Sequence, residues 1–390
     1  MKRKVVITGM GIICALGKGK EQVKNNLVLN ENCMVYLNNF GEYKNLSYVK
    51  VGAVNLNTSI TNDTDYDKSE WMARVAINEA CKQAGFDNLD FSNLGGKVAL
   101  SLSTSVMGSD YILKHVKSNE SKGVWIINSK AYVTRLAKEY KIKGGCYTTS
   151  SACASGTAGL GIAYDLISYD KADIVLCGGT DHITDISIYG FNALDTLSKD
   201  ICKPFDRERD GINIGEGSAF FILEEYEHAK KRNVEILSEV LGYGLSNDAY
   251  HETSPDPTGE GASRSMRMAM LEAGILKGRN VYINAHGTGT KANDSMEIKA
   301  IKTVFPKEQV MISSTKSLTG HCLGAAGSIE LAFSLMFLEE GYAPETANSN
   351  MDIEEGEEVI CSVEQSPEIH TIMSNSFAFG GNDATIIIGK

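Results

Sequence analysis

Residues Thr149–Gly161 read TSSACASGTAGLG, a stretch with one cysteine, no charged side chain and little that is larger than threonine. Cys153 is followed by glycine three and six residues later. The same spacing follows His321, which precedes Gly324, Gly327 and the apolar segment SIELAFSLMFLEE. Two small-residue helix starts, each headed by a reactive side chain, predict duplicated halves that meet at one site.

β-Branched runs alternate with amphipathic segments along the whole chain. The pattern predicts helices at 69–85 and 263–274, and strands at 5–8, 97–103, 172–179, 220–225, 281–287, 310–316 and 384–389. This alternation indicates α/β layers with largely parallel pairing. The charged segment 226–240 is the predicted join, which gives an N-terminal half at 1–235 and a C-terminal half at 236–390.

The composition excludes several classes of function. With 43% apolar and 22% charged residues among 390, the chain is typical of a soluble globular protein, and no stretch approaches the roughly 20 apolar residues of a membrane span. The net charge of −11 argues against nucleic acid or an anionic membrane as partner, although a local basic patch could bind an acidic protein. Nine scattered cysteines without a CxxC pair predict reduced thiols in a cytoplasmic protein, without a metal site.

Cys153 has two interpretations. If a helix begins near Ala154, the thiol lies by the helix N-terminus, where free N–H groups and the helix dipole favour a thiolate. The same N–H groups could stabilise an oxyanion formed at a bound carbonyl. The alternative is an inert buried cysteine, which is what most cysteines are.

Two histidines lie near strand ends in glycine-rich and hydroxyl-rich segments. His286 stands in NAHGTGT (284–290), and His321 follows SSTKSLTG (313–320). Each of them could instead bond only to backbone groups. Lys316 needs a partner in so uncharged a segment, and a pair with Glu330 would form a fixed strut.

Two further loops stand out. SNSFAFGGNDA (374–384) suits a mobile aromatic gate between two strands, or equally a packed hairpin tip. KPFDRERDGINIGEG (203–217) is interpreted as a self-paired surface loop. One thiol, two imidazoles and a lysine at strand and helix junctions together predict a cysteine-dependent acyl-transfer enzyme, and leave hydrolysis and condensation both open.

These segments closely resemble the β-ketoacyl-acyl-carrier-protein synthases, the elongating condensing enzymes of the thiolase superfamily. The resemblance runs through SACASG, PFDRERDG with GEG, NAHGTGT, SSTKSLTGHCLGAAG and SFAFGG, in the family's order, and covers essentially the whole chain. It implies the thiolase-like fold, two duplicated halves that form a five-layer α-β-α-β-α sandwich.

The resemblance also implies a decarboxylative Claisen condensation. Cys153 would take an acyl group from the phosphopantetheine thiol of an acyl carrier protein, with the N–H groups of Cys153 and Phe379 as the oxyanion hole. His286 and His321 would donate hydrogen bonds to the enolate of a malonyl thioester. The remaining implied site residues are the support pair Lys316 and Glu330, the pantetheine-binding Thr288 and Thr290, the acyl-pocket residues Phe191, Val106 and Met107, and the gate Phe379, Gly380 and Gly381.

The implied partner is the acyl carrier protein, and no tightly bound cofactor is implied. The chain would act as a homodimer, or as a heterodimer with a chain-length-factor-like subunit, in fatty acid or polyene and polyketide synthesis. Lys203, Arg207 and Arg209 are candidate contacts to the carrier, although acidic neighbours could pair with them instead.

Departures from the family pattern favour a specialised role. The gate loop reads AFGGND where the family commonly has GFGGTN, so Asp383 adds a charge. Asp181 stands where the family often has glutamate, and Met107 where glycine is frequent. A thiolase or an initiating synthase that uses acyl-coenzyme A is opposed by the two histidines. A non-catalytic chain-length-factor-like partner is opposed by the retained cysteine.

Overall fold

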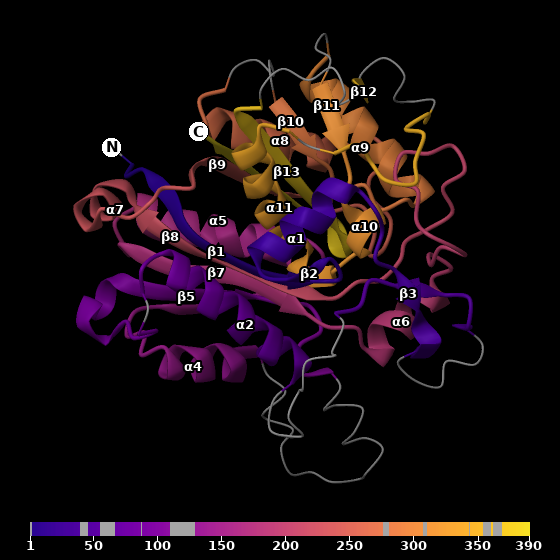
Figure 1. Ribbon diagram of the computed structural model, residues 1–390. Coiled ribbons are helices and arrows are strands. Elements are labelled where there is room, and N and C mark those ends of the chain that lie inside the picture. Colours follow the sequence, from indigo (N-terminus) through magenta and orange to yellow (C-terminus); the bar gives the residue numbers. More distant parts are fainter. Residues whose placement is uncertain are drawn as a thin grey trace.

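The protein is represented by a computed structural model that describes residues 2–39, 46–54, 67–86, 88–109, 129–275, 281–306, 310–342, 344–353, 360–361 and 369–390. Eleven of its described strands form one long hydrogen-bonded path in the order β12-β11-β10-β13-β14-β9-β1-β8-β7-β5-β6 (Figure 1). The N-terminal strands are β1 (Val5–Cys14), β5 (Val98–Ser103), β6 (Cys146–Thr149), β7 (Ile174–Asp181) and β8 (Gly217–Glu225). The C-terminal strands are β9 (Ser238–Asn247), β10 (Val281–Asn284), β11 (Val310–Ser313), β12 (Ile360–Cys361), β13 (Thr371–Ala378) and β14 (Asn382–Gly389).

The sheet is mirrored about its centre, where β1 and β9 pair. Outward from β1 the strands are β8, β7, β5 and β6, and outward from β9 they are β14, β13, β10 and β11. The pairs near the centre are antiparallel, and those toward both edges are parallel. The expectation of largely parallel pairing is therefore wrong for the central strands, because β13 and β14 form a hairpin and β8 runs back between β1 and β7.

The helices complete a five-layer sandwich (Figure 1). One outer layer contains α2 (Lys68–Gln83) and α4 (Ser129–Glu139), and the other contains α8 (Glu260–Glu272) and α9 (Lys291–Val304). In the middle, α5 (Ser155–Ser168) packs on β5, β7, β9 and β14, while α11 (Ala326–Glu340) packs on β1, β7, β8 and β13. All residues from 326 to 338 are buried, which explains why SIELAFSLMFLEE has no polar face.

The two central helices cross at a pair of glycines. A methyl group on Gly156 of α5 would lie 2.7 Å from the backbone nitrogen of Ser328 in α11. In return, a methyl group on Gly327 of α11 would lie 2.8 Å from the backbone nitrogen of Thr157 in α5. Real Cβ atoms do not approach so closely, so glycine at both positions is what lets the helices touch.

The remaining described elements are short. They are β2 (Gly17–Lys18), α1 (Lys20–Leu29), β3 (Val35–Tyr36), β4 (Lys50–Val51), α6 (Asp185–Ala193), α7 (Tyr226–Arg232) and α10 (Lys316–Thr319). Helix α7 lies between β8 and β9, inside the predicted join, and the division at residues 235 and 236 stays a prediction. Within the ranges described above, no helix is long and apolar enough to cross a membrane.

All seven predicted strands and both predicted helices are present, although β10 and β11 end three residues before the predicted ends at 287 and 316. The strands β6, β9 and β13 and the short strands β2, β3, β4 and β12 are not predicted by the sequence pattern. Strand β9 lacks a run of β-branched residues because α8 packs directly on it. A methyl group on Gly242 would lie 2.7 Å from Ala269 O, and one on Gly244 would lie 2.8 Å from Ala269 N. The glycines that this contact requires remove the usual signal of a strand.

Candidate active site

Cys153 stands on a tight turn between β6 and α5. The residue before it, Ala152, has a φ of 50°, a left-handed conformation that alanine rarely adopts. The Ala152 carbonyl accepts hydrogen bonds from Ser155 Oγ at 2.6 Å and from Ser105 Oγ at 2.9 Å. The Ser151 N–H donates to Ser155 Oγ at 2.8 Å. These serines hold the strained turn in place and thereby fix the direction of the thiol.

The Cys153 thiol is buried, with 7% of the residue exposed. The backbone N–H groups of Phe379 and of Cys153 itself face the sulfur. Helix α5 begins two residues after the cysteine, as predicted, but burial dominates and raises the pKa of the thiol to about 11. Lys316 and the two N–H groups lower that pKa without offsetting burial. The expected thiolate is therefore not the resting form at neutral pH.

His286 follows β10 and is anchored by Glu297 from α9. The Glu297 carboxylate accepts the N–H groups of His286 at 2.9 Å and Gly287 at 2.8 Å. Burial, followed by the positive charge of Lys316 and the neighbouring His321, holds the pKa of the imidazole well below its usual value. His286 is neutral at pH 7, so one ring nitrogen carries a proton and donates a hydrogen bond, and the other can accept a hydrogen bond.

His321 lies after β11 and α10, and its backbone N–H donates to Asn213 O at 2.7 Å. Its ring centre is 5.3 Å from that of His286, at an interplanar angle of 83°. Burial and then Lys316 hold the pKa of His321 well below the ordinary value. In the described part of the chain neither ring nitrogen has a hydrogen-bond partner. Such an unpartnered buried imidazole is open to a ligand.

Lys316 and Glu330 form the predicted buried pair. Lys316 Nζ donates to Glu330 Oε1, and the two residues are only 2% and 3% exposed. Burial raises the pKa of the Glu330 carboxyl to about 7, against the lowering effect of Lys316. Burial is the main reason that the pKa values of both histidines are low, and the positive charge of Lys316 lowers them further.

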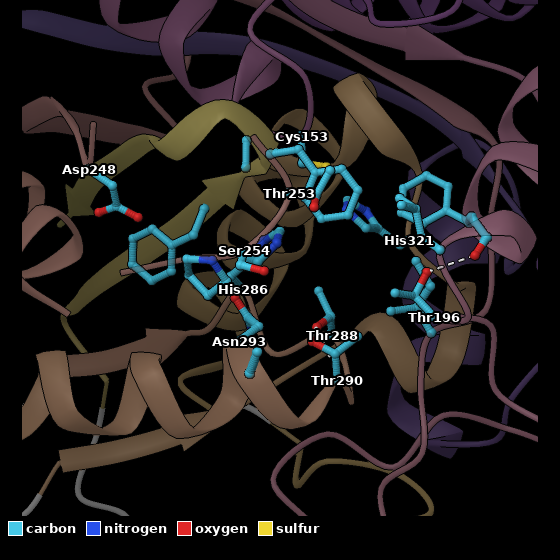
Figure 2. A pocket seen from close by; sticks show the side chains of 18 of the residues that line it. Cys153, Thr196, Asp248, Thr253, Ser254, His286, Thr288, Thr290, Asn293 and His321 are labelled. Atoms are coloured by element: carbon cyan, nitrogen blue, oxygen red, sulfur yellow. Dashed lines mark hydrogen bonds between the residues drawn. The ribbon is translucent and has the colours of Figure 1, made fainter. Parts of the chain in front are cut away.

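Cys153, His286 and His321 line one cavity of about 210 Å³, whereas Lys316 and Glu330 are not among the residues that line it. Figure 2 shows Cys153, His286 and His321 around the same space, with Thr288 and Thr290 on its other side. The two threonine hydroxyls are hydrogen-bonded to each other at 2.9 Å. The Phe379 ring also lines the cavity and stacks on Phe191, with ring centres 5.5 Å apart. The cavity thus joins a nucleophile, two imidazoles, hydroxyl groups and an aromatic pair.

The sequence as a whole matches two family models. Residues 2–229 match the N-terminal domain of beta-ketoacyl synthase, and residues 237–350 match its C-terminal domain. The chain belongs to the β-ketoacyl synthase family. It is 32% identical to 3-oxoacyl-[acyl-carrier-protein] synthase 2 of Coxiella burnetii, in an alignment that covers 100% of this chain and 99% of the relative.

Two solved structures resemble this synthase over the full length of both chains, each at 29% sequence identity. One is the ishigamide ketosynthase/chain length factor, with a TM-score of 0.87. The other is a type II polyketide synthase acyl carrier protein in complex with its ketosynthase bound to the hexaketide, with a TM-score of 0.85. The family, its acyltransferase chemistry and the thiolase-like fold predicted from the motifs are thereby confirmed.

The remaining predicted gate and acyl-pocket residues of the synthase lie in different parts of the structure. Gly380 and Gly381, with φ angles of 80° and 70°, form the turn that follows Phe379. Met107 packs among the apolar side chains of α2 and α4, and Val106 is half-buried. Neither side chain lines the cavity, so their role in an acyl pocket stays a prediction.

Asp181, which stands where the family often has glutamate, has a structural role that the sequence comparison did not predict. Its buried carboxylate accepts Thr104 Oγ1 and the N–H groups of Ser105, Val106 and Gly324. Burial raises the pKa of this carboxyl to about 6, against those hydrogen bonds. Asp181 thereby ties the loop after β5 to the segment after His321. The pattern GGTD at a strand end signalled a polar residue there, but not its partners.

The charged loop 203–217 differs from the expected surface loop. Arg209 is only 9% exposed, lies 3.9 Å from Asp294 and donates to Ser295 Oγ. The prediction that Arg209 contacts the carrier protein is therefore wrong, because its guanidinium group is buried and interacts with Asp294 and Ser295 inside the protein. Lys203 pairs with Glu208 at 2.9 Å, and Arg207 is exposed beside Asp352.

Proposed function

We propose that this synthase condenses an acyl group held on Cys153 with malonyl-acyl carrier protein to give 3-oxoacyl-acyl carrier protein and carbon dioxide. The observation that carries the proposal is the convergence of Cys153, His286 and His321 on one cavity. The relative from Coxiella burnetii, which is named a 3-oxoacyl-[acyl-carrier-protein] synthase, supports the same reaction class.

In the first half-reaction, the acyl carbon moves from the pantetheine sulfur to Cys153 Sγ. The thiol proton ends on the released pantetheine thiol, so the step is balanced without a further reactant. Negative charge develops on the acyl oxygen during the transfer, and the N–H groups of Cys153 and Phe379 form the proposed oxyanion hole for it.

In the second half-reaction, the malonyl thioester loses carbon dioxide and its enolate attacks the acyl-cysteine. The new carbon–carbon bond replaces the bond between the acyl carbon and Cys153 Sγ, and the released thiolate takes up a proton from solvent. We assign to His286 and His321 the donation of hydrogen bonds from Nε2 to the enolate oxygen. This role suits their neutral state, because each imidazole then has a single proton to offer. Lys316 and Glu330 act as support, since they hold the α10 segment that precedes His321.

Substrates would arrive on the phosphopantetheine arm of the carrier, without a tightly bound cofactor, in the cytoplasm. Thr288 and Thr290 offer hydroxyl groups for the amides of that arm. Phe379, Gly380 and Gly381 form the proposed gate, and Phe191, Val106 and Met107 the proposed acyl pocket. Lys203 and Arg207 remain candidate contacts to the carrier.

A second candidate role is the catalytic subunit of a ketosynthase/chain-length-factor heterodimer. Strand β6 ends the described sheet, and its residues Cys146 and Tyr147 are exposed immediately before the nucleophile. An uncovered edge strand is open to pairing with another chain. Similarity to the ishigamide ketosynthase/chain length factor supports such an arrangement, and a homodimer would use the same edge.

The reaction is tested by incubating the purified chain with acyl- and malonyl-carrier protein and measuring intact masses. The expected results are an acyl adduct on Cys153 and a 3-oxoacyl carrier two carbons longer than the starting acyl group. Cys33→Ala is the matched control, because it removes a partly exposed thiol away from the cavity and from strand β6, and should leave both products unchanged. Wild-type protein that forms neither product would overturn the proposal.

The subunit role is tested by measuring the molar mass of the purified chain in solution. An active dimer of this chain alone supports a homodimer, whereas an inactive monomer that gains activity with a second subunit supports the heterodimer.

A further inference from the structure

Two carboxyl groups meet beside the cavity, at the N-terminal end of α8. Asp383 lies on β14 and is 3% exposed, and Asp248 follows β9 and is half-buried. A methyl group on Gly261 would overlap Asp248 Oδ1 and lie 2.5 Å from Asp383 Oδ2. Asp383 Oδ2 has no hydrogen-bond donor among the described residues. Both aspartates line the cavity, and Figure 2 shows Asp248 at the left of the view, apart from Cys153, His286 and His321.

Two ionised carboxylates cannot share this position without repulsion, because an ionised carboxylate only accepts hydrogen bonds. Burial and the neighbouring Asp248 raise the pKa of Asp383 to about 9. Arg264 from α8 lowers that pKa, although it is also 3.6 Å from Glu260, and buried Glu297 from α9 raises it. A proton on Asp383 would turn this repulsion into a hydrogen bond to Asp248.

The pair is connected to the oxyanion hole through the backbone. We name residues 247–256 the clamp loop and residues 378–382 the gate turn. The Asp248 N–H donates to Gly381 O at 2.8 Å, and the Gly380 N–H donates to Glu252 O at 2.8 Å. Asn247 Nδ2 donates to Gly380 O at 2.9 Å. The clamp loop therefore holds the turn that carries Phe379, whose N–H faces the Cys153 sulfur.

We propose that Asp248 and Asp383 share one proton and act as positioning residues, so that losing this proton separates the clamp loop from the gate turn and displaces the Phe379 amide. The consequence for catalysis rests on the proposed condensation, whereas the movement of the turn does not. Asparagine at position 383 would donate an amide hydrogen to Asp248 at every pH, and alanine would donate none.

The test is hydrogen–deuterium exchange of the gate turn in wild type, Asp383→Asn and Asp383→Ala between pH 7 and pH 10. The single-turnover rate of Cys153 acylation is measured in parallel. Since the protonated fraction of Asp383 falls about tenfold by one pH unit above its pKa of about 9, we expect the protection factor of the gate turn in wild type to fall about tenfold by pH 10. The acylation rate of wild type should fall about tenfold relative to that of Asp383→Asn, because ionisation of Cys153 affects both proteins alike. The protection factor of Asp383→Asn should change less than about twofold, and Asp383→Ala should be poorly protected at pH 7 already.

Asp256→Asn is the matched control, because it removes one charge from the same clamp loop while, among the described residues, its side chain bonds only Thr258. The hydrogen bond of Asp256 to the pair comes from its backbone N–H, which donates to Asp248 Oδ2 and is kept in the variant. It should follow the wild-type curve. Equal loss of protection in wild type and Asp383→Asn would overturn the proposal. If the proposed reaction were wrong, no acylation would be seen, yet the exchange curves would still differ between the two proteins.

Discussion

The segments before Cys153 and before His321 occupy equivalent places in the two halves, after β6 and after β11, but they are built differently. The residue before each reactive side chain has a positive φ, 50° at Ala152 and 72° at Gly320. Alanine at the first position is strained and is held by two serine hydroxyls, whereas glycine at the second adopts its conformation readily. The backbone turn before Cys153 is therefore strained, whereas the equivalent turn before His321 is not. The His321 ring is open to a ligand.

The largest test of this difference removes each reactive side chain in turn. Cys153→Ala should abolish acylation and condensation together, because no other group can hold the acyl chain. His321→Ala should lower condensation by about 10²–10³-fold, as expected for one lost oxyanion donor, while Cys153 can still be acylated. Intact mass and single-turnover rates separate the two outcomes. A cysteine variant that still elongates acyl chains would contradict the assignment.

The next test removes the strut that lies only in the C-terminal half. Lys316→Met leaves Glu330 buried without its partner, which should lower the free energy of unfolding by about 3–5 kcal/mol. Lys316→Met with Glu330→Gln should recover much of this loss, as measured by chemical denaturation.

The double variant also reports on the site, because Lys316 lowers the pKa of Cys153, His286 and His321 alike. Without that charge, all three pKa values should move upward. Alkylation rate against pH follows the thiol, and NMR titration follows the imidazoles. Titration midpoints that stay unchanged in the double variant would show that burial alone sets the pKa values of the thiol and the two imidazoles.

A smaller effect is expected where the halves touch. Gly156→Ala and Gly327→Ala should each lower the free energy of unfolding by about 1–3 kcal/mol, because each methyl group meets the other helix. The double variant should cost less than the sum of the two, since both act on one contact. Gly190→Ala in α6, where a methyl group meets nothing within 4 Å, is the control and should be neutral or stabilising.

The smallest effect is expected at Ala152, in contrast to the equivalent position Gly320. Gly320→Ala should destabilise by about 1–3 kcal/mol, because its φ of 72° and ψ of 175° suit glycine alone. Ala152→Gly relieves strain but adds freedom to the unfolded chain, so its effect should stay within about 1 kcal/mol. Thermal unfolding of both variants measures this contrast, and equal losses would mean that the turns are not strained differently.

Local patterns predicted the strands, the reactive helix starts and the Lys316–Glu330 pair, since each depends on neighbours in sequence or on a charge that needs a partner. They did not predict β9, whose glycines serve contact with α8. The thiolate expectation failed because helix geometry is local, whereas burial depends on the whole fold. The contact between Asp248 and Asp383 joins residues far apart in the chain, so only the adjacent strands β9 and β14 reveal it.

The shared central layer also has a consequence for how the protein is made. Helix α5 needs α11 to cover it, yet α11 begins at Ala326, long after α5 has left the ribosome. The N-terminal half therefore waits during translation with its glycine face uncovered, and its core closes only when the last quarter of the chain arrives. Of the three reactive side chains, Cys153 is synthesised first and His286 second. His321 and the gate turn complete the site near the end of synthesis.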